Sequence, residues 1–258
     1  MPGGEHGGLR VDAVTVRADG ALVLDDVALR AHPGAVTGIV GPPGAGKTTL
    51  ADVVTGWRRP ESGTVTLDGT DLTGAAPYVR ARAGLARTVH GGTPFGSLSV
   101  RDNVRAAVEI HALTRPVAGR GPRDRWRRRR AARASAAATA DVLLARTGIA
   151  PYAGHPAARV PAAVAPLLEI ARALATRPRV LLLDEPAAGL TDVRARALEV
   201  LLRDLAAEGL AVVLTAPDLS AVLGVCDTVH VLDRGRVAAS GPPAGVRGEP
   251  RVRALFAR

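Results

Sequence analysis

The stretch that decides the fold of this chain reads Gly41-Pro42-Pro43-Gly44-Ala45-Gly46-Lys47-Thr48. This is the pattern G-x-x-x-x-G-K-[ST], in which glycines let backbone N–H groups turn toward phosphate oxygens. A short apolar run at residues 35–40 precedes it, as a buried parallel strand would, and residues 48–55 continue as a helix. The N-terminus of that helix adds a positive dipole at the same place. The stretch therefore predicts a strand–loop–helix unit that binds the phosphates of a nucleotide.

The one lysine of the chain lies in this loop. Lysine and arginine total 34, and every one of them except Lys47 is an arginine. We expect the compact ammonium of Lys47 to reach the β- and γ-phosphates, and the hydroxyl of Thr48 to ligate Mg²⁺. The residues predicted to contact the nucleotide are Gly41, Pro42, Gly44, Ala45, Gly46, Lys47, Thr48 and Thr49.

A second motif supplies two adjacent carboxylates after the apolar run at residues 180–183. Asp184 is predicted to hold Mg²⁺, usually through water. Glu185 is in position to orient or deprotonate an attacking water. A strand that merely ends in two acids is the alternative, and the phosphate loop earlier in the chain argues against it. Lys47 and Glu185 are therefore the candidate catalytic residues, and Thr48 and Asp184 the candidate metal ligands.

Alternating strand and helix patterns indicate an α/β fold. Short apolar runs at residues 35–40, 179–183 and 210–215 are separated by helical patterns, which include residues 167–176 and 192–208. This alternation predicts a parallel sheet with helices on both faces. Together with the phosphate loop, the α/β pattern resembles the P-loop NTPase (RecA-like) fold.

Two other parts of the chain depart from this alternation. Strand patterns at residues 9–17, 22–30 and 64–67 predict a small antiparallel sheet. Residues 97–150 predict a helical insertion, with two helices around a linker rich in Pro, Gly and Arg. We expect one domain over residues 1–258. Its parts are the antiparallel subdomain with the phosphate loop (9–90), a helical subdomain (91–160), and the carboxylate motif with a C-terminal hairpin (161–258).

The formal net charge of +10 suggests an acidic partner. Because the basic residues are almost all arginine, we attribute this charge mainly to compositional bias and predict no nucleic-acid partner. The arginines at residues 127–130, beside Trp126, could contact nucleic acid or lipid headgroups, but a solvated helical face is the favoured interpretation. Cys226 is the only cysteine, which excludes an intrachain disulfide. No apolar run is long enough to span a bilayer, so work at a membrane requires docking onto another subunit.

On these motifs and five further stretches, the chain resembles the ATP-binding subunit of an ABC importer of the branched-chain amino-acid (or related amide/urea) branch. The stretches are residues 82–88 (RAGLART), 168–175 (LEIARALA), 183–190 (LDEPAAGL), 231–237 (VLDRGRV) and 249–252 (EPRV). The resemblance implies an ATPase that uses ATP and Mg²⁺ to drive uptake of branched-chain amino acids or a similar small solute. It also implies transmembrane permease subunits as partners, a solute-binding protein as an indirect one, and peripheral attachment at the cytoplasmic face of the plasma membrane.

The family further implies a second ATP-binding subunit packed head to tail, so that each ATP lies between one phosphate loop and the partner's signature loop. Four places depart from that pattern. Ala18 replaces an aromatic that would stack on adenine, a contact worth on the order of 1–3 kcal/mol. His90 replaces a glutamine that would touch Mg²⁺, and Pro217, which cannot donate a hydrogen bond, replaces the switch histidine. Residues 160–166 (VPAAVAP) replace the glycine-containing signature loop, although Pro166 suits the first turn of the next helix.

These departures predict slow or partner-dependent turnover and a heterodimer with a chain of different sequence. One alternative is a degenerate regulatory subunit that binds nucleotide with little or no turnover beside an active partner. The intact Glu185 argues against that alternative. A second is a nucleic-acid-linked ATPase of the same family, which rests only on the arginine run and lacks a second cassette or a long coiled insertion.

Overall fold

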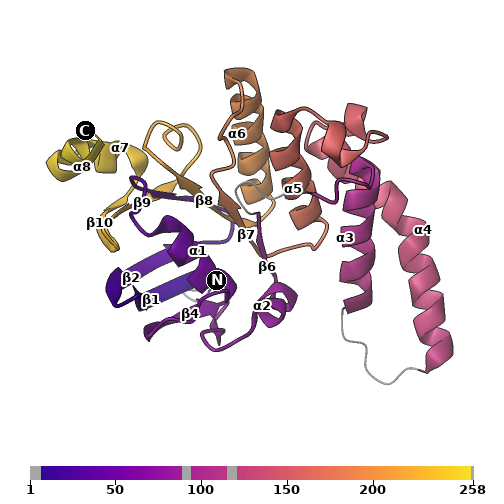
Figure 1. Cartoon of the computed structure of the whole chain (residues 1–258), viewed down its shortest axis with the longest axis horizontal. Coiled ribbons are helices and arrows are strands. Elements are labelled where there is room, and N and C mark those ends of the chain that lie inside the picture. The colour runs from indigo at the N-terminus through magenta and orange to yellow at the C-terminus, as the bar shows by residue number, and fades with distance from the viewer. Residues whose placement is uncertain (1–6, 89–93, 115–120, 257–258) are drawn as a thin grey trace, which may run out of the picture. The chain divides into compact units, whose positions relative to one another are not determined.

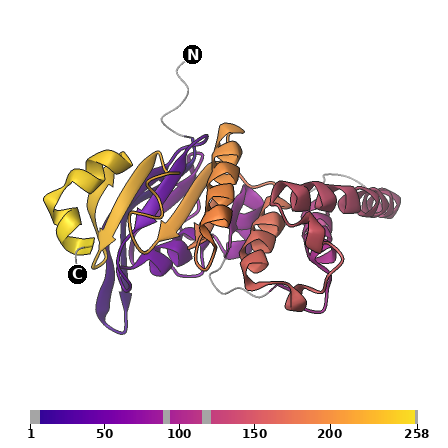
Figure 2. The same ribbon diagram turned by 90° about the horizontal axis from the view of Figure 1, so that it is seen from above.

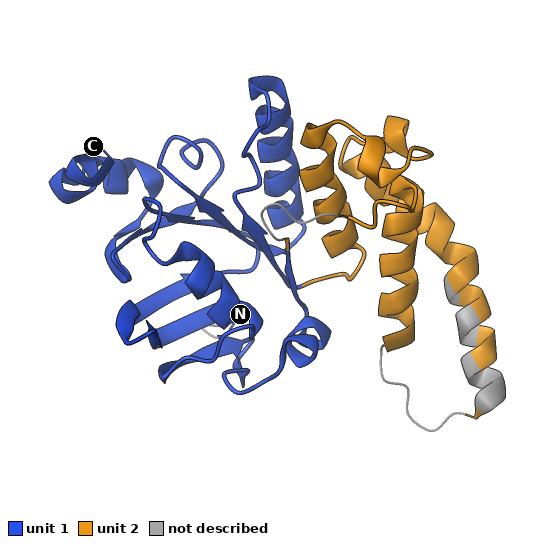
Figure 3. Cartoon of the chain, in the orientation of Figure 1, with its two compact units in different colours: residues 1–87, 179–258 blue, residues 88–178 orange. Residues whose placement is uncertain are grey.

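The computed structural model describes residues 7–88, 94–114 and 121–256, which form two compact units (Figure 1; Figure 3). Unit 1 joins residues 1–87 to residues 179–258, and unit 2 is residues 88–178. The predicted subdivision ended the helical part at residue 160, whereas the structure groups residues 161–178 with it. The reason is that α5 (Ala165–Leu174) packs against the other helices of unit 2. The single domain over residues 1–258 stays a prediction.

A six-stranded sheet forms the centre of unit 1, in the order β10-β9-β3-β8-β7-β6. Its members are β3 (Val36–Val40), β6 (Leu85–Arg87), β7 (Val180–Asp184), β8 (Ala211–Ala216), β9 (Thr228–Asp233) and β10 (Arg236–Gly241). All neighbours pair in parallel except β9 and β10, which pair antiparallel. Strands β3, β7 and β8 are buried along their whole length, as strands covered on both faces must be. The predicted parallel sheet is confirmed, and β6 is an added strand too short to recognise from its pattern.

Helices cover both faces of this sheet, as predicted (Figure 1). Helix α1 (Lys47–Thr55) contacts β6 and β7, and its Leu50 shares a core cluster with Val180 and Leu182. Helix α6 (Asp192–Ala207) contacts β3 and β8, and its Leu198 lines a pocket with Leu214 of β8. Because alternate residues of a strand point to opposite faces, the two sets of side chains belong to two apolar layers.

The second sheet of unit 1 is antiparallel, in the order β2-β1-β4-β5. Its strands are β1 (Leu9–Ala18), β2 (Ala21–Ala31), β4 (Ser62–Leu67) and the two-residue β5 (Thr70–Asp71). The β1–β2 hairpin turns through Asp19 (φ 51°) and Gly20 (φ 80°), the positive angles that an Asp-Gly turn requires. The buried side chains of this sheet belong to the same core cluster as side chains of α1 and β3. The sheet therefore packs against the two elements that flank the phosphate loop.

Three shorter helices complete unit 1. Helix α2 (Pro77–Ala83) precedes β6, and α7 (Pro243–Gly248) and α8 (Pro250–Phe256) both contact β10, beside which they lie in two views (Figure 1; Figure 2). Arg80 of α2 is almost fully buried and donates to the carbonyls of Val53 (2.6 Å) and Val54 (2.8 Å) at the end of α1. These bonds satisfy carbonyls that a helix end leaves without partners.

Unit 2 contains the predicted helical insertion. Helices α3 (Val100–Thr114) and α4 (Pro122–Arg146) pack side by side as an antiparallel hairpin (Figure 1; Figure 2). Short turns, η1 (Ala150–Tyr152), η2 (Ala157–Arg159) and η3 (Ala162–Val164), lead from there to α5. The hairpin interface is tight because Ala136, Ala140 and Leu144 recur at helical spacing and are fully buried. Within the described ranges of the chain, no helix has both the length and the apolar character needed to cross a bilayer.

Candidate functional site

The phosphate loop occupies residues 41–46, between the end of β3 and the start of α1. A Cβ atom on Gly41 would lie 2.2 Å from the carbonyl oxygen of Leu232, and one on Gly46 (φ 105°) would lie 2.8 Å from Leu24. Gly44 (φ 79°) has open space around it and needs glycine for its backbone angle alone. The loop is therefore wound closely against β9 and β2, with its middle left open.

Several backbone N–H groups of this loop and of the first turn of α1 find no acceptor among the described residues. They belong to Gly44, Gly46, Lys47, Thr48 and Thr49. Helix N-termini leave such donors unpaired, and together with the helix dipole they form a site for an anion.

Ala45 and Pro42, also predicted to contact the nucleotide, use their backbone groups inside the loop. The Ala45 N–H donates to the Pro42 carbonyl (3.1 Å), and the Ala45 carbonyl accepts from Gly235 (3.0 Å). The Ala45 side chain is buried. These two residues shape the loop, and the open donors lie on the residues around them.

Lys47 begins α1 and folds back over the loop that precedes it. Its Nζ atom donates to the carbonyls of Gly41 (2.6 Å) and Pro42 (3.2 Å), and the residue is only 8% exposed. Burial lowers the pKa of Lys47, and the charges of Glu185 and Asp184 oppose that shift. An ammonium has three donors, so one remains for an anion in the loop.

The two carboxylates of the second motif lie at the carboxyl end of β7. Asp184 is its last residue and is buried, and Glu185 follows with φ 46°, a left-handed angle that is uncommon outside glycine. Both are held by Thr215 of the neighbouring strand β8, which pairs with Asp184 in the parallel register. The Thr215 hydroxyl donates to Asp184 Oδ1 (2.7 Å) and accepts from the Glu185 N–H (3.0 Å). One fully buried hydroxyl thus fixes both acidic residues.

Arg87, the last residue of β6, completes this arrangement from the other side of β7. Its guanidinium lies 3.3 Å from Asp184 Oδ2 and 2.6 Å from Asp52 Oδ1 of α1, and its side chain is 9% exposed. It therefore links the phosphate-loop helix to the strand that carries the carboxylates. In the sequence, Arg87 is recognisable only as part of a family stretch and Thr215 belongs to no motif, because neither contact follows from local spacing.

The residues present fit a nucleotide phosphate with Mg²⁺. The open N–H groups and Lys47 suit phosphate oxygens, and the Thr48 hydroxyl is exposed and free of hydrogen bonds to described residues. In the part of the chain that the structure describes, no group of three or more His, Cys, Asp or Glu side chains could hold a metal. Mg²⁺ needs no such group, since it is bound through one or two protein oxygens, phosphates and waters. Both Asp184 oxygens already contact protein groups, which agrees with binding through water.

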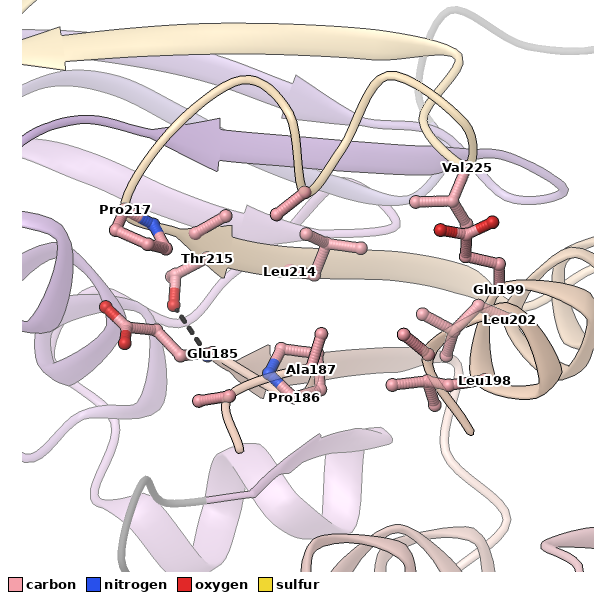
Figure 4. A pocket seen from close by; sticks show the side chains of 14 residues that line it. Glu185, Pro186, Ala187, Leu198, Glu199, Leu202, Leu214, Thr215, Pro217 and Val225 are labelled. Carbon is pink, nitrogen blue, oxygen red and sulfur yellow. Dashed lines mark hydrogen bonds between the residues drawn. The ribbon is translucent and has the colours of Figure 1, made fainter. Parts of the chain in front are cut away.

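The structure also locates three of the four family departures. Ala18 ends β1 and is half-buried, and its methyl group is too small to stack on a base. Pro217 directly follows β8 and lies with Glu185 and Thr215 at one end of a largely apolar pocket of about 200 Å³ (Figure 4). Residues 160–166 run from η2 through η3 into α5, which has Pro166 in its first turn as predicted. His90 lies outside the described residues.

Comparison with known proteins identifies relatives of the whole chain. The family model described as ABC transporter matches residues 24–188. The chain is 32% identical to the high-affinity branched-chain amino acid transport ATP-binding protein BraF of Pseudomonas aeruginosa, over 95% of both chains. It is 34% identical to the lipopolysaccharide export system ATP-binding protein LptB of Acidithiobacillus ferridurans, over 91% of this chain and 90% of LptB. Among solved structures, a nucleotide-free ATP-binding cassette from an ABC transporter matches with a TM-score of 0.80 and 24% identity, over 96% of this chain and 98% of the other.

Proposed function

The chain belongs to the ABC transporter family of ATP-binding proteins, and from that premise we propose that it binds Mg-ATP and hydrolyses it to drive uptake of branched-chain amino acids or a similar small solute. One observation carries the nucleotide part. One end of the parallel sheet carries all the groups that a nucleotide needs: the open backbone N–H groups, the buried ammonium of Lys47, and the carboxylates of Asp184 and Glu185. Ligands of open α/β sheets bind outside the carboxyl ends of the strands.

Each residue has a defined part in the reaction. The N–H groups of residues 44 and 46–49 and the free donor of Lys47 bind the phosphate oxygens and balance their charge. Thr48 and, through water, Asp184 would hold Mg²⁺, which would supply positive charge to offset the charge that develops on the phosphate oxygens. Glu185 accepts a proton from the water whose oxygen attacks the γ-phosphorus, while the bond from that phosphorus to the departing ADP oxygen breaks.

Turnover is proposed to be slow and to depend on a partner of different sequence. The support lies in the substituted places. Pro217 has no N–H to offer beside Glu185, and residues 160–166 contain no glycine and no side-chain hydrogen-bond donor. Two copies of this chain would therefore meet two impaired sites, whereas an intact second ATP-binding subunit would supply the missing loop to this chain's ATP.

The proposed partners follow from the relatives' descriptions. BraF is a branched-chain amino acid transport protein, so we assign this chain to permease subunits for such solutes, at the cytoplasmic face of the plasma membrane, with a solute-binding protein as an indirect partner. LptB, whose sequence identity to this chain is similar to that of BraF, belongs to an export system. Export is therefore the alternative direction of transport. Solute uptake by the reconstituted transporter separates the two directions.

Nucleotide binding and hydrolysis by the purified chain test the catalytic part. We expect Mg-ATP binding that is lost in Lys47→Ala, and hydrolysis that is lost in Glu185→Gln while binding remains. Asp204→Asn, an exposed carboxylate on α6, is the control and should change neither. Binding that requires Lys47 but gives no turnover, alone or with an intact partner, would establish the regulatory alternative. Absence of binding would refute the proposed function.

A further inference from the structure

The arginines of α4 are too concentrated to be explained by the composition of the chain. Seven of the eleven residues 123–133 are arginine, whereas the chain as a whole has about one in eight, which would place one or two in such a window. This density argues against a merely solvated helical face. Three observations of the structure argue against it as well.

The first observation is that the described basic side chains of this segment share one flank of the helix with a tryptophan. At 100° per residue, Trp126, Arg127, Arg130 and Arg133 fall within an arc of about 120°. Trp126 is 61% exposed, Arg127 and Arg130 are exposed, and the Arg130 guanidinium lies 5.7 Å from the centre of the Trp126 ring. The flank is therefore both cationic and amphipathic.

The second observation concerns the charge that remains after ion pairs within the hairpin are counted. Arg133 lies 3.7 Å from Glu109 of α3, and the same carboxylate lies 3.3 Å from Arg105. Arg127 and Arg130 have no carboxylate within ion-pair distance among the residues that the structure describes. Among the described residues no carboxylate offsets the charge of these two guanidinium groups, which leaves them available to an anionic partner.

The third observation is that apolar side chains are exposed at the same end of the hairpin. Ile110 (59% exposed) and Leu113 (48% exposed) lie in the last turn or so of α3, which the antiparallel arrangement brings to the end at which α4 begins (Figure 1; Figure 3). We call Ile110, Leu113, Trp126, Arg127 and Arg130 the hairpin tip. Exposure of three large apolar side chains, Ile110, Leu113 and Trp126, at one end of a hairpin is typical of a binding surface and not of a face that contacts only water.

We propose that the hairpin tip docks onto anionic phospholipid headgroups at a membrane surface. Arginine binds lipid phosphates, each basic residue adds attraction to an anionic leaflet, and tryptophan partitions to the headgroup region. The aliphatic Ile110 and Leu113 decide between lipid and nucleic acid, since acyl chains receive aliphatic groups whereas a nucleic acid is bound through charge and stacking. The contact would orient this chain at the bilayer independently of any permease subunit, and it does not depend on nucleotide.

Sedimentation of the whole chain with vesicles tests the proposal without nucleotide, so a failure of ATP binding does not affect it. We expect binding to phosphatidylcholine vesicles that contain phosphatidylglycerol, and little binding to phosphatidylcholine alone. Binding should weaken on going from about 0.1 M to about 1 M salt, where screening shortens to about 3 Å. Arg127→Gln with Arg130→Gln should weaken it about 25-fold, or about five-fold for each guanidinium. Trp126→Ala should weaken it at both salt concentrations.

The matched control is Arg58→Gln with Arg59→Gln, which removes the same charge from two exposed arginines beside the exposed Trp57 in unit 1. It should change vesicle binding less than two-fold. Arg127→Lys with Arg130→Lys, which keeps the charge, should restore most of the binding and shows that a loss in the glutamine variant is not misfolding. Equal losses in the control and the hairpin-tip variant would overturn the proposal. Binding of a duplex RNA that depends on Arg127 and Arg130, without vesicle binding, would overturn it in favour of a nucleic-acid partner.

Discussion

Replacing Thr215 by valine removes the hydroxyl that holds both acidic residues of the site and leaves the shape of the side chain almost unchanged. Two hydrogen bonds are lost, one to the charged Asp184 carboxylate (2.7 Å) and one from the Glu185 N–H (3.0 Å). Thr215 is fully buried, so water cannot easily replace them. A bond to a charged group contributes about 1.5–3 kcal/mol and a neutral one about 1 kcal/mol, so we expect unit 1 to lose about 3 kcal/mol of stability. That corresponds to a fall of roughly 6–12 °C in its unfolding midpoint.

The functional consequence concerns Mg²⁺ and turnover more than the nucleotide itself. Without Thr215, the Asp184 carboxylate can rotate, and the left-handed backbone of Glu185 loses its anchor. We expect Mg²⁺ to strengthen ATP binding several-fold less in Thr215→Val than in the unaltered chain, while affinity without Mg²⁺ stays the same. Fluorescent-nucleotide titrations with and without Mg²⁺, together with thermal unfolding, measure both effects.

Thr37→Val is the matched control for this prediction. Thr37 is also a buried threonine in a strand of the same sheet, but its hydroxyl makes no hydrogen bond to a described residue. Its replacement should change the free energy of unfolding by less than about 1 kcal/mol, because no hydrogen bond to a described residue is lost. If the two variants unfold at the same temperature and respond alike to Mg²⁺, Thr215 does not organise the site.

Three further outcomes follow from individual contacts. Gly46→Ala should abolish nucleotide binding and lower stability because its Cβ meets Leu24, whereas Gly44→Ala, with open space, should retain measurable binding; equal losses in calorimetric titrations would contradict the packing. Arg87→Gln should destabilise the chain by about 3–5 kcal/mol in denaturant unfolding, because the buried Asp184 carboxylate keeps its bond from Thr215 but loses the positive charge of the guanidinium; a change below 1 kcal/mol would show that this ion pair does not stabilise the fold. Burial raises the pKa of the Cys226 thiol from 9.0 to about 12, so this thiol should resist alkylation at pH 9 in the folded chain and react in the unfolded chain. The contribution of this group to the free energy of unfolding is complete below pH 9 and declines as the pH rises toward 12. Rapid labelling of the folded chain at pH 9 would refute the burial.

Much of the fold and of the candidate site could be predicted because the signals are local. One continuous stretch of sequence contains the strand, the phosphate loop and the helix that follows it. Lys47, the only lysine of the chain, identifies the loop within that stretch. Asp184 and Glu185 follow an apolar run that predicts a buried strand. By contrast, the end of the helical unit was predicted at residue 160 and lies at residue 178. The pattern of α5 identifies a helix but contains nothing that names the elements against which the helix packs.

The sequence by itself determined the groups on which the proposed chemistry depends: a phosphate loop with one lysine, two carboxylates after a strand, and the four departures from the family pattern. Only the tertiary structure decided which groups hold those carboxylates and which apolar residues of α3 share an end of the hairpin with the arginines of α4. Thr215 reaches Asp184 through the register of two parallel strands, and Arg87 reaches it through a third. Ile110 and Trp126 belong to the same end of the hairpin only because α3 and α4 are antiparallel. Local motifs follow from the preferences of neighbouring residues, whereas these contacts depend on long-range packing, which single-sequence patterns do not encode.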